Sequence, residues 1–161
     1  MKKAFLLSLF CVLSLTLSGC GKAPLMDELD ASSKVYHFKS ESMGFKVDLP
    51  ESFQYYQVQQ KIGKNEKGEQ TTDFRDMEFL IPAKDRAFND LRNTDVPGYA
   101  KVFIVRVYEK GKYKDQGFEK LIEAKDKTYA IKFWTNLPSE WQNVWTSKDE
   151  NNIKQSLMTL E

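Results

Sequence analysis

Two carboxylates have the spacing closest to a catalytic pair in this chain. Asp76 and Glu78 alternate within a strand-like segment, so both should leave one face of the strand, about 6.7 Å apart along the backbone. That gap is near the lower end of the ~6.5–9.5 Å between the carboxylates of inverting glycosidases. Glycosidase carboxylates usually come from different elements around a cleft, whereas these two share one strand. We therefore expect a solvated polar face and assign no catalytic residue here.

Other catalytic patterns fail on a required residue. Gly63 and Gly68 have the glycine spacing of a phosphate-binding P-loop, but Glu69-Gln70 replaces the lysine and hydroxyl residue that follow it. There is no Gly-x-Ser-x-Gly elbow, and a Ser-His-Asp triad would have to use His37, the single histidine. His37 lies in an alternating segment, so we interpret it as an ordinary strand residue.

Cysteine usage excludes further chemistry. The two cysteines are Cys11 and Cys20, so the chain after position 20 has neither a free thiol nor a disulfide. The chain also has a single histidine. Thiolate zinc sites, Cys-His nucleophiles and multi-histidine metal sites are therefore excluded. We expect no metal and no cofactor.

The first residues have the parts of an export signal. Lys2 and Lys3 precede an apolar run over residues 4–17, which is shorter than the ~20 residues that a spanning helix needs. The run therefore predicts a cleaved signal peptide at residues 1–19.

The end of this signal, Leu17-Ser18-Gly19-Cys20, resembles the lipobox of bacterial lipoproteins. The resemblance implies cleavage before Cys20 and a diacylglyceryl group on its thiol. Since one acyl chain binds a membrane only marginally, a two- or three-chain anchor would be stable. Gly21, where an Asp would resemble an inner-membrane retention signal, points to the outer membrane if the source has two membranes. The alternative is a secreted protein with a chance cysteine.

The remaining 142 residues have the size of one domain, with a formal net charge of −1 after loss of the signal lysines. This near-neutral balance argues against a nucleic-acid partner. Residues 20–34 are expected to be a lipidated cysteine and tether, and residues 35–161 a single domain.

Strand patterns dominate that domain. Alternating apolar residues predict strands over 45–49, 53–62, 71–81 and 129–134, and the loop formers of 63–69 predict a hairpin. Residues 99–108 are apolar on both faces, which indicates a central strand. In 53–62, Tyr56, Val58 and Ile62 should share one face.

Helical spacing is expected in three places. Phe118, Leu121 and Ile122 follow i, i+3, i+4, and Ser139 and Ser147 have capping-box spacing. The last helix would carry Ile153, Leu157 and Leu160 on one face. The pattern predicts an α+β fold of mostly antiparallel sheet flanked by helices, ending in an amphipathic helix.

This order of elements resembles that of Mog1/PsbP-like domains over residues 35–160. The resemblance rests on the segment Met43-Gly44-Phe45-Lys46-Val47-Asp48-Leu49-Pro50 and on the ending Ile153-Lys154-Gln155-Ser156-Leu157. The resemblance implies an antiparallel sheet in an α/β/α-like sandwich, and a binding or assembly role.

Two features are candidates for binding. Lys110, Lys112 and Lys114 alternate in a stretch, residues 101–132, that has nine basic and five acidic side chains, and they could meet anionic lipid or a wall polymer. Ordinary solvation is the simpler interpretation. The second candidate is Trp134, in a cluster that holds all three tryptophans. Exposed rings there could stack on sugars, but we favour core packing, with Trp145 the most buried and Trp134 more exposed.

The sequence thus predicts a lipid-anchored cell-envelope lipoprotein with a non-catalytic binding or accessory domain, whose partners are membrane lipid through Cys20 and an envelope protein or glycan. The alternative is an envelope hydrolase of glycan or ester bonds that uses carboxylates or serine.

Overall fold

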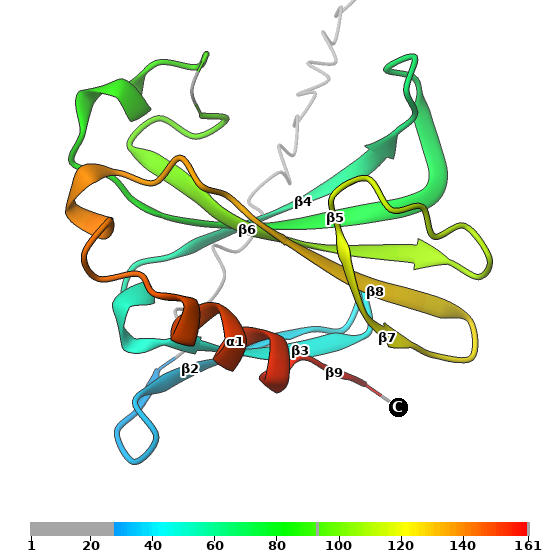
Figure 1. The fold of residues 1–161 in the computed structure, drawn as a ribbon, viewed down its shortest axis with the longest axis horizontal. Helices are drawn as coiled ribbons and strands as arrows, with labels where there is room; N and C mark the ends of the chain where they lie inside the picture. The colour runs from blue at the N-terminus through cyan, green and yellow to red at the C-terminus, as the bar shows by residue number, and fades with distance from the viewer. Residues whose placement is uncertain (1–27, 93, 161) are drawn as a thin grey trace, which may run out of the picture.

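Two antiparallel sheets form the body of the protein (Figure 1). The computed structural model describes residues 28–92 and 94–160. One sheet has the order β1-β2-β3-β9 and the other the order β4-β5-β6-β8-β7. The strands are β1 Leu29–Asp30, β2 Val35–Ser40, β3 Phe45–Pro50, β4 Gln57–Lys64, β5 Gln70–Pro82, β6 Tyr99–Glu109, β7 Glu119–Glu123, β8 Lys127–Phe133 and β9 Met158–Thr159. The predicted mostly antiparallel sheet is confirmed.

The helical elements are few in the described residues. The one α-helix is α1, Ser147–Ser156, and three 3-10 turns complete the set: η1 Glu51–Phe53, η2 Arg86–Asn89 and η3 Ser139–Trp141. Thr146 caps α1 in a capping box with Asp149, one residue before the predicted cap. Ile153 and Leu157 are buried as expected, but Leu160 follows β9 because the helix ends at Ser156.

The small sheet follows the period-2 pattern. Phe45, Val47 and Leu49 on β3 are buried, and Lys46 between them is exposed. β1 pairs with β2 through Leu29 and Asp30, so these two residues belong to the sheet although they lie in the predicted tether.

In the large sheet β6 lies between β5 and β8, as its two apolar faces predicted. The β4–β5 hairpin is also confirmed, with Gly68 at φ +79° in its turn. Ile62 keeps the register of Val58, which places both on one face as predicted. It lies where the register then shifts to Gly63, and it is 57% exposed. A Cβ on Gly63 would lie 2.5 Å from the Phe74 carbonyl oxygen, so only glycine fits this position.

The main core lies between the sheets. The Phe38 ring of β2 meets the Phe79 ring of β5 edge-on at 5.0 Å, and Phe45 meets Tyr129 of β8 at 6.3 Å. The Tyr129 hydroxyl donates to the Gly44 carbonyl at 3.1 Å. These contacts lock the sheets face to face, and we call the face of the large sheet that faces this core its inner face.

The helix predicted over residues 118–122 is wrong, because Glu119–Glu123 forms strand β7 at the edge of the large sheet. The register shifts between Lys120 and Ile122, so Leu121 and Ile122 both pack against the main core. Phe118 lies in a separate cluster on the other face. A β-bulge therefore produced the i, i+3, i+4 spacing.

The helix expected from Ser139 is a single 3-10 turn, and the predicted order of tryptophan burial is wrong. Trp141 is buried at 9% exposure, packed against Phe53 with ring centroids 5.9 Å apart. Trp145 is half-buried, and its indole N–H donates to Glu150 at 3.2 Å. Trp145 therefore borders the core with its polar edge outward.

Candidate functional site

The outer face of the large sheet, opposite the inner face, carries Asp76 and Glu78 with their partners. Cross-strand register places Asp76 opposite Arg106, Glu78 opposite Ile104, and Phe74 opposite Tyr108. A small apolar cluster covers part of this face. Its members are Phe74, Ile104, Tyr108, Phe118 and Ala130, with Tyr113 and Trp134 packed against them.

Asp76 is bound to Arg106 by two hydrogen bonds. Arg106 donates from Nε to Oδ1 at 2.7 Å and from Nη2 to Oδ2 at 2.9 Å. The guanidinium lies 3.9 Å from the ring centre of Phe74 and 4.0 Å from that of Phe118. Burial is the largest single influence and lowers the pKa of Arg106, but hydrogen bonds and charge interactions with Asp76 and Tyr108 together outweigh it and the pKa is raised. The pair is a fixed structural unit.

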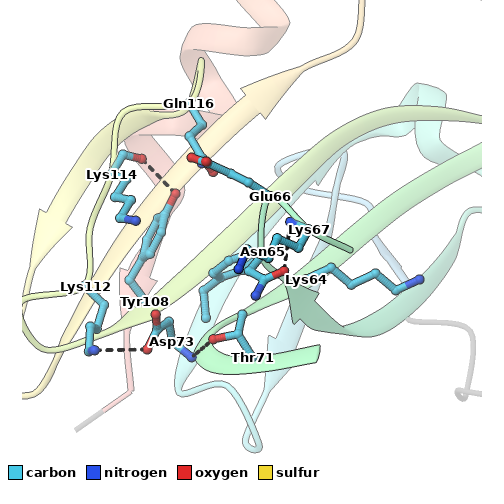
Figure 2. A pocket seen from close by; sticks show the side chains of 11 residues that line it. Lys64, Asn65, Glu66, Lys67, Thr71, Asp73, Tyr108, Lys112, Lys114 and Gln116 are labelled. Carbon is cyan, nitrogen blue, oxygen red and sulfur yellow. Dashed lines mark hydrogen bonds and ion pairs between the residues drawn. The ribbon is translucent and has the colours of Figure 1, made fainter. Parts of the chain in front are cut away.

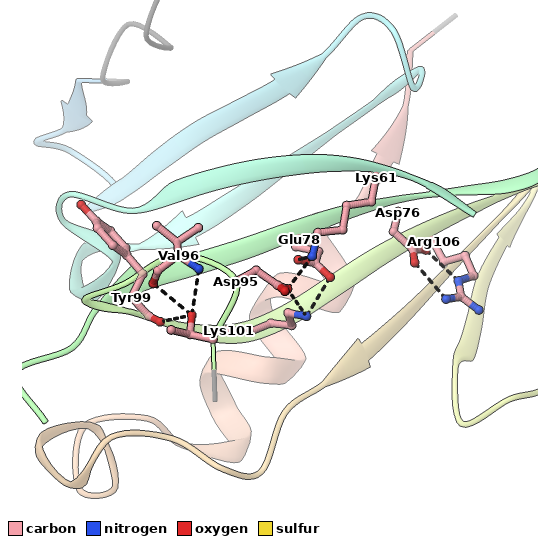
Figure 3. A network of polar contacts seen from close by, with 9 residues as sticks. Lys61, Asp76, Glu78, Asp95, Val96, Tyr99, Lys101 and Arg106 are labelled. Atoms are coloured by element: carbon pink, nitrogen blue, oxygen red, sulfur yellow. Dashed lines mark hydrogen bonds and ion pairs between the residues drawn. The ribbon is translucent and has the colours of Figure 1, made fainter. Parts of the chain in front are cut away.

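Glu78 is 4% exposed, so the predicted solvated face is wrong for this residue (Figure 3). The ammonium groups of Lys61 and Lys101 each lie 2.8 Å from one of its carboxylate oxygens, although the Lys61 contact lacks hydrogen-bond geometry. Asp95 bridges the two lysines from the solvent side, and its hydrogen bond from Lys61 lowers the pKa of Asp95. We call these four residues the carboxylate–lysine network.

These partners limit what Asp76 and Glu78 can do. A general acid or base must exchange a proton with a substrate, and both carboxylates already face cations of the protein. The arrangement suits structural ion pairing on a covered sheet face better than acid–base catalysis.

A depression of about 240 Å³ lies at one end of the same face, between the β4–β5 turn and the β6–β7 loop (Figure 2). We call it the basic depression. It is lined by Lys64, Asn65, Glu66, Lys67, Thr71, Asp73, Phe74, Tyr108, Lys112, Lys114 and Gln116. Figure 2 shows Lys112, Lys114 and Tyr108 on one side and residues 64–67 on the other.

Both loops around the basic depression are held by side-chain hydrogen bonds. Asn65 Oδ1 accepts from the backbone N–H groups of Lys67 and Glu69, which closes the β4–β5 turn. Tyr108 donates its hydroxyl to the Lys114 carbonyl at 3.0 Å, and Arg106 donates to Gln116 at 3.2 Å. Burial raises the pKa of Tyr108 and so favours the protonated phenol that this bond needs.

The lysines of the basic depression differ in their partners. Lys112 lies 3.1 Å from Asp73, while Lys64, Lys67 and Lys114 form no ion pair with any residue that the structure describes. Glu66 is the one acidic lining residue without such a pair in the described chain. The local balance is therefore positive.

The structure separates the four predicted binding residues. Lys112 and Lys114 line the basic depression, whereas Lys110 does not. Trp134 is half-buried and lines another cavity, of about 250 Å³, with Lys101 and Lys132 at 5.0 and 5.3 Å from its ring centre. Sequence reasoning missed Lys64 and Lys67, which it treated only as hairpin residues.

His37 stands apart from this face. Its Nδ1 lies 2.7 Å from Asp48 on β3, and its Nε2 lies 3.4 Å from Asp30 on β1. These contacts raise the pKa of His37, the hydrogen bond to Asp48 most. Across residues 28–92 and 94–160, the structure shows neither a cluster of three or more potential metal ligands nor a helix able to span a membrane. Cys20 lies outside the described residues.

Comparison with protein-family models, curated proteins and solved structures finds no match to this chain. The candidate site therefore has to be interpreted from its own geometry.

Proposed function

We propose that this chain is an exported lipoprotein, anchored to a bacterial membrane through lipid on Cys20, whose β domain is a non-catalytic binding or accessory module. Leu17-Ser18-Gly19-Cys20 and the charged and apolar segments before it support the anchor. Gly21 favours the outer membrane where the source has two. The expected partners are membrane lipid and an envelope protein or glycan.

One observation carries the non-catalytic part of the proposal. The two carboxylates with the most catalytic spacing, Asp76 and Glu78, are both paired with cations on a covered sheet face. The hydrolase alternative would require a free carboxylate or an activated serine beside a cavity. In the basic depression Asp73 is paired with Lys112, and Glu66 is the carboxylate left over.

The resemblance to Mog1/PsbP-like domains stays a prediction. An antiparallel sheet followed by a C-terminal helix supports it. The α/β/α-like sandwich that it implies has less support, because α1 is the one α-helix in the described residues and a second sheet packs on the first.

The anchor is tested by changing Cys20→Ala and fractionating cells. The wild type should be in the membrane fraction with an acyl mass on the processed chain, and the variant should lose both, because no thiol remains to carry lipid. Cys11→Ala, which changes the other cysteine of the chain, is the matched control and should behave like the wild type. A wild type without acyl mass would refute the proposed anchor.

A further inference from the structure

Two groups of cations can be distinguished on the outer face of the large sheet. Those of the central outer face, Lys61, Lys101 and Arg106, all contact carboxylates within 2.8 Å. Those of the basic depression include Lys64, Lys67 and Lys114, for which the described residues provide no carboxylate partner. Three lysines without a carboxylate partner in the described residues thus gather at one end of this face, where two loops distant in sequence meet. Lys132, elsewhere on the face, lies over the rings of Phe118 and Trp134 instead.

We propose that the basic depression binds a phosphate ester, with the phosphate held by its lysines and a short carbon skeleton against the exposed edge of Phe74. The proposal rests on the proposed role of the β domain as a binding module and names the class of its ligand. It does not depend on the lipid anchor at Cys20.

The type of cation favours phosphate over carboxylate. Carboxylate recognition commonly uses the two parallel donors of an arginine, but none of the lining residues is an arginine. Arg106, next to the depression, is already bound to both oxygens of Asp76. Lysine ammonium groups act as mobile point charges, which suits a tetrahedral group with several charged oxygens.

Size and shape favour a small ligand. The depression of about 240 Å³ is below the ~300–1,000 Å³ of drug-sized pockets. Phe74 and Tyr108 lie beneath it, 9% and 1% exposed with ring centroids 5.5 Å apart, so only a small apolar edge, mainly of Phe74, is open to a ligand. A phosphate with a few attached carbons fits both the volume and this surface.

The loops are ordered before any ligand arrives. Asn65 holds the turn that carries Lys67, and Tyr108 and Arg106 hold the loop that carries Lys114. Binding would therefore cost mainly the freedom of the lysine side chains and little backbone entropy.

The first test titrates the full-length protein, in a non-ionic detergent, with glycerol 1-phosphate by calorimetry, with glycerol as the uncharged probe. The variant Lys64→Gln/Lys67→Gln/Lys114→Gln should bind at least tenfold more weakly, about 1.4 kcal/mol. The matched control Lys46→Gln/Lys125→Gln/Lys148→Gln removes three other exposed lysines without ion pairs to described residues and should bind like the wild type. Melting curves verify that each variant is folded.

A gain of affinity sharpens the test. Glu66→Gln removes the unpaired carboxylate from the lining and should tighten binding several-fold, and added salt should weaken binding in every variant. Equal loss in both triple variants would mean bulk charge and would overturn the site. So would wild-type binding of glycerol as tight as that of its phosphate, or no phosphate binding.

A second arm identifies the source of the phosphate. In nanodiscs of phosphatidylcholine with or without phosphatidylglycerol, hydrogen exchange of residues 64–69 and 110–116 reports whether the depression meets headgroups. Protection that appears only with phosphatidylglycerol assigns the site to lipid. Unchanged exchange with intact binding in solution assigns it to a soluble ester. Absence of both signals overturns the site, whereas failure of the anchor shows separately in the Cys20→Ala fractionation.

Discussion

On the inner face of the large sheet, Phe79 and Phe103 stack with ring centroids 4.3 Å apart and an interplanar angle of 10°. On the outer face, Glu78, the residue before Phe79, contacts Lys61 and Lys101. Arg106 and Asp76 form a further ion pair on that face. The inner face is filled by hydrocarbon, whereas the outer face carries charge pairs, a small aromatic cluster and the basic depression.

Side-chain substitutions should affect the stability of the two faces differently. Apolar burial stabilises in proportion to the area removed from water, so the inner face depends on side-chain volume. A buried ion pair gains little overall, because attraction mainly offsets desolvation, but losing one partner leaves an uncompensated charge. The outer face therefore depends on keeping each pair complete.

The largest expected effect compares the same residue type on the two faces. Trp141 packs in the main core, whereas Trp134 lies half-buried at the edge of the outer cluster. Trp141→Ala should cost about 3–5 kcal/mol of unfolding free energy, and Trp134→Ala about 1 kcal/mol from lost contacts with Lys101 and Lys132. Urea unfolding of both variants measures this, and equal losses would contradict the distinction between the faces.

An intermediate effect is expected in the carboxylate–lysine network. Glu78→Gln leaves Lys61 and Lys101 facing each other with only Asp95, and should cost about 2–3 kcal/mol. The matched change Glu123→Gln breaks the exposed pair with Lys120 on β7 and should leave the melting temperature almost unchanged, because solvent screens that pair. Thermal unfolding at neutral pH compares them; a similar small shift for both would mean that the network is no more than a surface pair.

The smallest effect is expected from an exposed contact on the other sheet. The pKa of His37 is raised above 6.5 by hydrogen bonds to Asp48 and Asp30, so its stabilisation is present below pH 6.5 and is lost as pH rises through the raised pKa. The wild-type melting temperature should therefore drop slightly more than that of His37→Gln between about pH 6 and pH 8. The lowered pKa of Asp30, caused first by Ser32, acts in the opposite sense and only in acid. Identical pH profiles would exclude the contact as a stabilising pair.

Local pattern was enough for the strands that follow a strict period of two. The burial of Phe45, Val47 and Leu49 and the central position of β6 could be predicted, because alternation and two-sided apolarity are visible in neighbouring residues. The hairpin turn over residues 63–69 was equally readable from its glycines. The sequence likewise suggested Lys112 and Lys114, two of the residues that line the candidate site.

Tertiary structure decided everything that depends on register or on distant partners. A bulge at residues 120–122 gave a strand the apolar spacing of a helix. Trp141 and Trp145 both pack on Phe53, but the indole N–H of Trp145 donates to Glu150 and that ring stays half-buried. Glu78 is buried because Lys61 and Lys101 reach it from neighbouring strands. Lys67 lies across a depression from Lys114 because two loops meet over one sheet face. The sequence by itself determined which residues are apolar, charged or turn-forming, but their distances from one another come from long-range strand pairing, which no local pattern encodes.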